Sequence, residues 1–255
     1  MLVIRTEQIV ALEQAHVDRF TDEFVNHLRS FAPDRYASLG RDAVRKTVNL
    51  GLSNAERHGF TLRGPVRFYL ELMFRFGSFF DTDRQYQEVT RPLFDDSGTD
   101  EIIRADRLYD RVMNYVDAAA GIDFRFERRA LETTANMSYE ALASLAGQPS
   151  AALVEWISHI YPEKVQALGK PVIRALVNDA GGFAISFGPS CVGATPLFAL
   201  LMFILGSNCF SDPQFPWLVR ALDRPAMPDA EVALEEAFRG FITLLAPFRS
   251  TLEKR

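Results

Sequence analysis

This chain of 255 residues has few cysteines, no long apolar run and no excess of basic charge. Its two cysteines never form a CxxC pair, which argues against a structural zinc site or a redox centre. The longest apolar run, Leu197 to Leu205, has nine residues, whereas a membrane-spanning helix needs about 20. The net charge of −5 gives no bulk attraction to nucleic acid or to an anionic membrane. The first residues lack the apolar segment of a signal peptide, so we expect a cytoplasmic protein with no membrane span.

Motifs that hold phosphates, metals or nucleophiles are missing as well. Gly181-Gly182 and Gly188 lack the spacing of a phosphate-binding loop, and the turn at Ser207 lacks the GxSxG pattern of a hydrolase. The histidines form no HxxxH or HExxH pair: they are His16, His27, His58 and His159. We therefore predict no catalytic residue, no metal ligand, no cofactor and no nucleic-acid partner.

An internal repeat organises what is present. At an offset of 129 residues, positions 33–94 match positions 162–223 without a gap, with 18 identities in 62 positions. A chance register would give about four. We interpret this as a tandem duplication of a helical unit. Because apolar residues recur at three- and four-residue steps and no stretch alternates like a strand, the predicted fold class is all-α. The predicted halves are residues 1–129 and 130–255, pseudo-symmetric and forming one compact unit.

Proline, glycine and apolar spacing set the expected helix limits. In the first half we expect helices over Thr6–Phe31, Arg41–His58, Pro65–Phe80 and Gln85–Phe94. In the second half we expect them over Ser138–Tyr161, Lys170–Gly181, Thr195–Cys209 and Gln214–Leu222. A bridging helix is expected over Thr99–Ala120 and a C-terminal helix over Asp229–Leu252.

The helix around Leu197 to Leu205 differs most from its first-half counterpart. Glu71 and Arg75, four residues apart, have the spacing of a solvated ion pair, whereas their counterparts are Leu200 and Ile204. A helix that is apolar on every side is typical of a buried one, so we predict that it forms the centre of the fold. Docking of a partner or of a second copy of the chain, and insertion into a membrane, are the alternatives.

The loops after the third helix of each half supply the candidate partner-binding residues. They are Asp81, Asp83, Phe210, Asp212 and Trp217. A tryptophan between prolines can anchor a partner, although it can equally pack against Pro213 and Pro216 in the core. An aspartate that opens a short helix is also typical of an N-cap, which is the simpler interpretation of Asp83. Cys191 and Cys209 are expected to be buried small apolar residues.

Part of each half resembles a bacterial family. The similarity rests on His58-Gly-Phe60, Val66–Phe74, Phe76-Gly77 and Phe80–Asp83, and in the second half on Leu201–Phe203, Gly206, Phe210–Pro213 and Pro216-Trp217. These residues resemble small helical proteins encoded beside PAAR-repeat, VgrG or Rhs genes of type VI secretion loci. The second half lacks the His-Gly pair and the first acidic residue of the loop. The resemblance implies a role in loading or holding a secreted effector and supplies no catalytic residues.

The leading hypothesis is a non-enzymatic adaptor or co-chaperone that binds a type VI effector, a PAAR-type spike protein or a VgrG-type protein. One alternative is an immunity protein that blocks a cognate toxin. Another is a toxin or enzyme with an active site of an unrecognised type. A homodimer is also compatible with the sequence.

Overall fold

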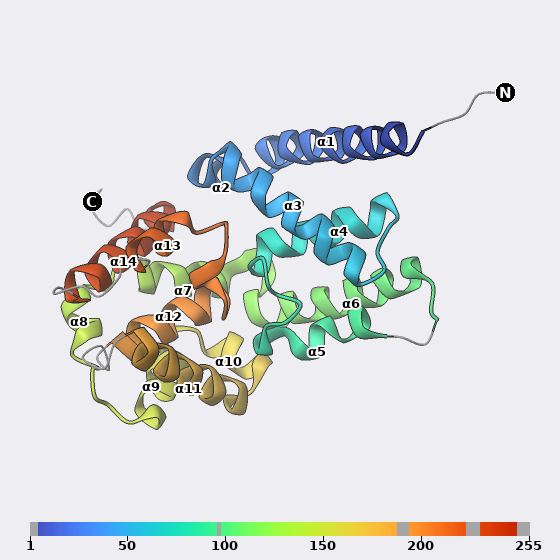
Figure 1. Ribbon diagram of the computed structural model, residues 1–255. Helices are drawn as coiled ribbons and strands as arrows, with labels where there is room; N and C mark the ends of the chain where they lie inside the picture. Colours follow the sequence, from blue (N-terminus) through green and yellow to red (C-terminus); the bar gives the residue numbers. More distant parts are fainter. Residues whose placement is uncertain (1–4, 96–97, 188–193, 223–229, 249–255) are drawn as a thin grey trace.

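The computed structural model describes residues 5–95, 98–187, 194–222 and 230–248. These residues form fourteen α-helices, short 3₁₀ turns and no strand, which confirms the all-α class (Figure 1). The first-half helices are α1 (Thr6–Phe31), α2 (Pro33–Leu39), α3 (Arg41–Arg57), α4 (Arg63–Phe76), α5 (Gln87–Thr90) and α6 (Glu101–Ala120). The second-half helices are α7 (Arg125–Ala135), α8 (Tyr139–Ala143), α9 (Ser150–Ile160), α10 (Pro162–Leu168), α11 (Lys170–Phe187), α12 (Thr195–Leu205), α13 (Pro216–Leu222) and α14 (Ala230–Leu244).

Proline and glycine account for several matching helix limits. Pro33 and Pro162 occupy the first position of α2 and α10, where a missing N–H costs nothing. Both helices end at a glycine with positive φ, +78° at Gly40 and +85° at Gly169. α2 and α10 thus begin and end at positions 129 residues apart, and α3 and α11 begin at that same offset.

Several expected helix limits were wrong, and local chemistry explains them. The expected helix over Ser138–Tyr161 is two helices, α8 and α9, because Gly147 at φ +75° and Pro149 interrupt it. The segment Gln85–Phe94 is α5 between two 3₁₀ turns, not one helix. α4 and α12 stop at Phe76 and Leu205, before the expected limits, because a glycine follows each of them.

Smaller differences lie at other helix ends. α3 ends at Arg57, one residue early, and α11 continues six residues past Gly181. α6 begins at Glu101 instead of Thr99, where Asp100 accepts a hydrogen bond from the Ile102 N–H at 2.8 Å. The C-terminal helix α14 ends at Leu244, earlier than the expected limit at Leu252, and a 3₁₀ turn over Ala246–Phe248 follows it. Residues 223–229 and 249–255 lie outside the described residues.

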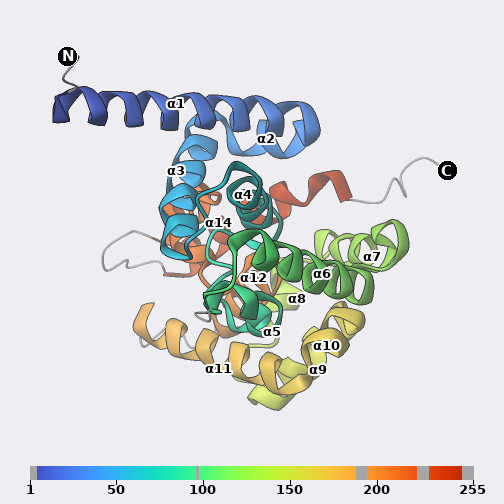
Figure 2. The ribbon, with the colours of Figure 1, turned by 90° about the vertical axis from the view of Figure 1, so that its right-hand side faces the viewer.

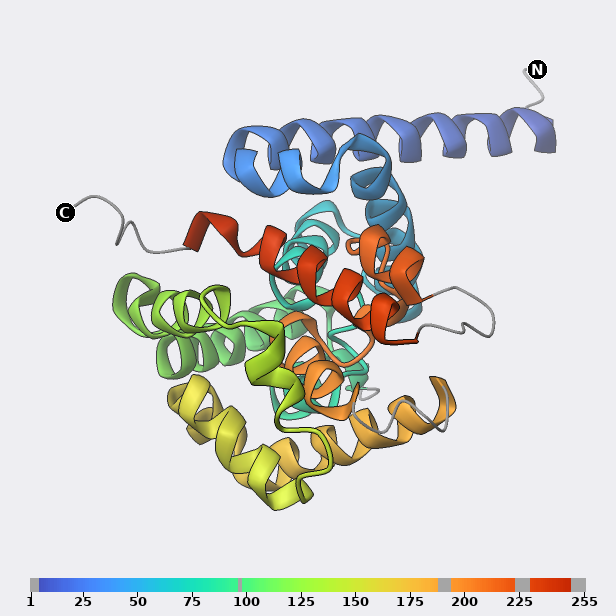
Figure 3. The same ribbon diagram turned by 90° about the vertical axis from the view of Figure 1, so that its left-hand side faces the viewer.

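α12 lies in the interior, as predicted. Every residue from Pro196 to Phe203 is buried, as is Leu205, whereas Thr195 and Ile204 are half-buried. Helices α8, α11 and α14 pack around it, and Figure 3 shows it enclosed within the second half. The burial confirms the central-helix interpretation over docking or membrane insertion. None of the helices in the described ranges is long and apolar enough to cross a membrane.

The buried apolar residues form two clusters. One contains residues between Phe24 and Val112, and the other contains residues between Ala130 and Leu245. α1 rests on the first cluster only through its C-terminal part, and its first turns project beyond the body of the molecule (Figures 1 and 2). In this projecting part Leu12 and Val17 are exposed.

Candidate functional site

Two glycine turns cross between the halves. Gly77 ends α4 with φ +102°, and Gly206 ends α12 with φ +105°. A Cβ added to Gly77 would lie 2.8 Å from the carbonyl oxygen of Leu205, and one added to Gly206 would lie 3.1 Å from that of Phe76. The two backbones therefore approach as closely as only glycine allows.

Each half supplies an aspartate to the turn of the other half. The Asp212 carboxylate accepts hydrogen bonds from the N–H and hydroxyl of Ser78 at 2.7 and 2.5 Å. The Asp83 carboxylate accepts from the N–H and hydroxyl of Ser207, both at 2.7 Å. Burial raises the pKa of Asp212, although hydrogen bonds from Ser78 oppose the shift. The exchange joins residues more than 120 positions apart.

The same aspartates also begin the next turn of their own half. Asp83 accepts from the Gln85 N–H at 2.9 Å, and Asp212 accepts from the Gln214 N–H at 2.8 Å. This confirms the N-cap interpretation of Asp83. Both glutamine amides then donate across the crossing, Gln85 to the Met202 carbonyl at 2.9 Å and Gln214 to that of Met73 at 2.8 Å.

Two basic residues bind the last free carbonyls of α4 and α12. Because Ser78 and Ser207 give their N–H groups to aspartates, the carbonyls four residues earlier lack helical partners. Arg35 Nη2 donates to the Phe74 carbonyl at 3.4 Å, and Lys164 Nζ donates to the Phe203 carbonyl at 2.5 Å. Arg35 and Lys164 are counterparts at the 129-residue offset, as are the two carbonyls.

The predicted partner-binding residues do not gather on one surface. Asp83 and Asp212 meet at the crossing, where both are buried. Asp81 is buried beside His58, whose Nε2 lies 2.8 Å from its carboxylate. Burial acts to raise the pKa of Asp81, but hydrogen bonds from His58 and Tyr69 and the charge of His58 together outweigh burial and lower this pKa.

The two aromatic candidates lie elsewhere and are half-buried. Phe210 stacks on Phe183 with ring centroids 4.1 Å apart. Trp217 packs so closely on α14 that a Cβ at Gly240 would lie 2.3 Å from its ring. Trp217 thus contacts the second-half core, as in the second of the two interpretations made from the sequence. Cys209 is buried, as expected, whereas Cys191 lies outside the described residues.

A cavity of about 500 Å³, here named the open pocket, lies between the α1–α2 corner and the end of α14. Figure 3 shows α14 running beneath α1 and α2. Its lining includes Phe31, Ala32, Arg35, Phe74, Arg75, Glu127, Phe215, Leu244, Leu245 and Phe248. Sequence reasoning missed this pocket because its lining comes from six separate segments. Their alignment at the 129-residue offset was the one available signal.

A second cavity, here named the closed pocket, lies where α10 packs on α6 and measures about 50 Å³. Nine of its lining residues are offset counterparts of open-pocket residues: Arg75, Phe76, Tyr86, Tyr115, Val116, Ala119, Tyr161, Lys164 and Ile204 correspond to Ile204, Leu205, Phe215, Leu244, Leu245, Phe248, Ala32, Arg35 and Arg75. Burial raises the pKa of its three tyrosines and lowers the pKa of Lys164 to about 8. The same framework therefore surrounds one large space and one nearly filled space.

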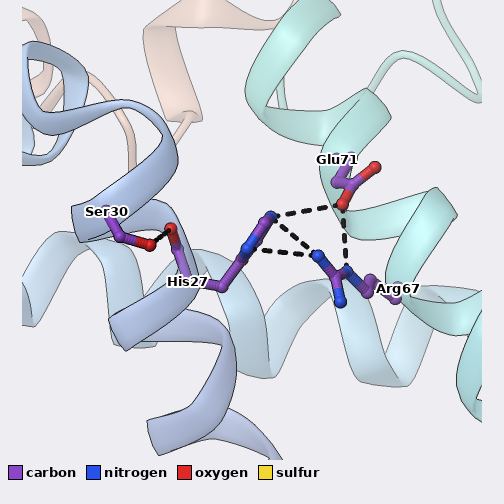
Figure 4. A network of polar contacts seen from close by, with 4 residues as sticks. All are labelled: His27, Ser30, Arg67 and Glu71. Carbon is purple, nitrogen blue, oxygen red and sulfur yellow. Dashed lines mark hydrogen bonds and ion pairs between the residues drawn. The ribbon is translucent and has the colours of Figure 1, made fainter.

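An ion pair forms a wall common to both pockets. Arg75 on α4 donates to both carboxylate oxygens of Glu127 on α7, at 2.7 and 2.5 Å. This pairing corrects the expectation that Arg75 pairs with Glu71. Figure 4 shows Glu71 beside Arg67 and His27 instead, at 3.1 and 3.4 Å. That network links the C-terminal half of α1 to α4.

Arg35 is the least satisfied cation at the open pocket. Its Nη2 donates to the Gln214 side-chain oxygen at 3.0 Å as well as to Phe74, and both acceptors are uncharged. Its Nε is buried without a hydrogen-bond partner. Within the described ranges Arg35 forms no ion pair. Burial lowers the pKa of this guanidinium, which marks a charge held away from water.

Nothing in the part of the chain that the structure describes brings three potential metal ligands together. No protein-family model, curated protein or solved structure matches this chain. The functional interpretation therefore starts from the geometry of the two pockets.

Proposed function

We propose that this protein is a non-enzymatic adaptor that holds an apolar segment of a partner protein in the open pocket. The observation that carries the proposal is the contrast between about 500 Å³ in the open pocket and about 50 Å³ in its counterpart. Phe31 at the mouth is 76% exposed and Phe248 is 37% exposed. Apolar side chains around a concave site are typical of places where another chain docks.

The acidic residues favour a binding role over a catalytic one. Asp83 and Asp212 each accept hydrogen bonds from a serine of the opposite half and from their own turn. Asp81 is engaged by His58. These carboxylates therefore hold the two halves and the loop in place.

We further propose that the two halves descend from a tandem duplication. The backbone angles at Gly77 and Gly206 agree within 5°, and those at Asp83 and Asp212 agree within 3°. The reciprocal hydrogen bonds of the crossing join counterpart atoms. Duplication explains why one pocket could stay packed while the other diverged into a binding site.

The resemblance supplies the class of partner. We propose a type VI secretion effector, or a PAAR-type or VgrG-type spike protein, held in the cytoplasm before secretion. The closest alternative is a cognate toxin bound by an immunity protein, which would use a surface of the same chain for a different purpose.

The test compares tagged variants in the native host. Leu244→Tyr places in the open pocket the residue that occupies the counterpart position in the closed one. Ile185→Tyr, at a position 62% exposed on α11, adds the same side chain away from the pocket. We expect wild type and Ile185→Tyr to recover an effector or spike-type protein in near-stoichiometric amount, and Leu244→Tyr to lose most of it.

Three outcomes would count against the proposal. Full recovery with folded Leu244→Tyr would remove the open pocket as the site. Recovery of no effector or spike-type protein by the wild type would remove the adaptor function. Recovery of a toxin against which expression protects the cell would favour the immunity alternative.

A further inference from the structure

We infer that the open pocket recognises the C-terminal aromatic residue of a bound segment, its ring in the cavity and its carboxylate on Arg35. The partner in this inference rests on the proposed function, whereas the ligand chemistry rests on the two pockets. The closed pocket provides a template for what fills this framework.

Aromatic rings fill the closed pocket. Tyr115 packs with Tyr86 and Phe76 at centroid distances of 5.7 and 5.8 Å, and Tyr161 lines the same space. At the counterpart positions the open pocket has Leu244 and Ala32, which leave room where two phenol rings lie in the closed pocket. Phe74, Phe215 and Phe248 remain as walls. A flat aromatic group is therefore the shape that completes the open pocket, and aromatic side chains gain most from such burial.

The charge at Arg35 calls for an acceptor from outside. In the closed pocket, Lys164 Nζ donates to the hydroxyl of Tyr86 at 3.4 Å as well as to the Phe203 carbonyl. In the open pocket Phe215 has no hydroxyl, and the Nε of Arg35 has no acceptor. A buried guanidinium with unused donors favours a carboxylate, which accepts charge-assisted hydrogen bonds.

The other charges of the pocket do not compete for this role. Glu127 is the acid in the wall, and both of its oxygens accept from Arg75. The charge of Asp212 raises the pKa of Arg35, but the Asp212 carboxylate accepts its hydrogen bonds from Ser78 and Gln214. Arg35 thus remains available to an incoming anion.

A C-terminal residue combines the two features compactly. Its carboxylate and its ring share one α-carbon, so one residue can occupy the cavity and reach the guanidinium together. The exposed rings of Phe31 and Phe248 then line the path of the preceding apolar residues.

Short peptides test this chemistry on the full-length protein by ligand-observed NMR. The probe is acetyl-Gly-Leu-Tyr with a free carboxylate, compared with its C-terminal amide and with acetyl-Gly-Leu-Leu. We expect the free acid to bind about tenfold more tightly than the amide, because a charge-assisted bond at a buried site is lost in the amide. The leucine peptide should bind several-fold more weakly than the tyrosine peptide.

Two variants and one control assign the effect to residues. Arg35→Gln should abolish the preference for acid over amide while keeping the preference for tyrosine, whereas Arg41→Gln on the surface of α3 should keep both. Leu244→Tyr should abolish binding of all three peptides, and it remains informative even if Arg35→Gln fails to fold. Equal binding of acid and amide, or an acid preference retained in Arg35→Gln, would overturn the inference.

The two proposals fail in different ways. If the peptides bind selectively but no partner is captured, the proposed ligand chemistry stands and the proposed adaptor function is wrong. Capture of an effector or spike-type protein that depends on the pocket, without peptide selectivity, would remove only the ligand chemistry.

Discussion

The open and closed pockets share a framework and differ in what fills it. In the closed pocket α10 packs on α6, and three tyrosines with Lys164 leave about 50 Å³. At the counterpart positions of the open pocket, an alanine, a leucine, a phenylalanine and an arginine line about 500 Å³. Removing large side chains from a close-packed position leaves space that neighbours fill only in part. A few positions thus separate a packed interior from a site that can receive a ligand.

At the crossing of the glycine turns, Asp83 and Asp212 make nearly the same hydrogen bonds. Asp83→Asn and Asp212→Asn each place an amide N–H opposite a buried donor, so we expect each to lower the free energy of unfolding by about 3 kcal/mol. Urea denaturation measures both, with Asp110→Asn on the exposed face of α6 as the control. A large loss in only one of the two would show that the halves depend on the crossing unequally.

The second prediction concerns the pH dependence of stability caused by Lys164, the closed-pocket counterpart of Arg35. The pKa of Lys164 is lowered to about 8, so between pH 8 and pH 10 the folded state has released a proton that the unfolded state retains. The free energy of unfolding therefore rises with pH in this window, by about 2 kcal/mol relative to Lys164→Met. Denaturation series at pH 7, 8.5 and 10 measure this difference. A constant difference across the series would contradict it, and Lys164→Arg should show no such rise.

Exchanging one residue between the pockets should have unequal consequences. Tyr115→Leu empties space in the closed pocket and should cost about 1.5 kcal/mol, whereas Leu244→Tyr enters existing space and should change stability by less than about 1 kcal/mol. Thermal unfolding checks both. Tyr115→Phe keeps the ring and should stay close to wild type, and an equal cost for the two exchanges would mean that the open pocket has no usable space.

The smallest effect concerns the wall common to both pockets. A double-mutant cycle on Arg75→Gln and Glu127→Gln should give a coupling energy of about 1 kcal/mol, because the pair is bidentate and partly buried. The pair Arg63 and Glu23, in which both side chains are largely exposed, should couple by less than about 0.5 kcal/mol. Equal coupling energies in the two cycles would contradict the claim that the Arg75–Glu127 pair is stronger than an exposed ion pair.

Local chemistry made several features predictable. The limits of α1 at Thr6 and Phe31 follow from apolar spacing and the proline at position 33, and the burial of α12 follows from a helix that is apolar all round. The N-cap role of Asp83 also follows from its place before a short turn. The expected ion pair between Glu71 and Arg75 was wrong because an ion pair depends on which charged side chain lies nearest in space. Arg67 and His27 lie closer to Glu71 than Arg75 does.

The candidate site depended on tertiary contacts that no local pattern contains. Helix limits follow from glycine, proline and periodicity, which act within a few residues, so the sequence by itself determined the all-α class and the central helix. The partners Ser78 and Asp212 stand 134 positions apart, and the open pocket joins α1–α2, α4, α7, α12 and α14. Only the tertiary structure decided that Asp83 and Asp212 hold the crossing, and that side chains nearly fill one pocket but leave about 500 Å³ in its counterpart. The reason is that packing volume and hydrogen-bond partners depend on which side chains meet in space.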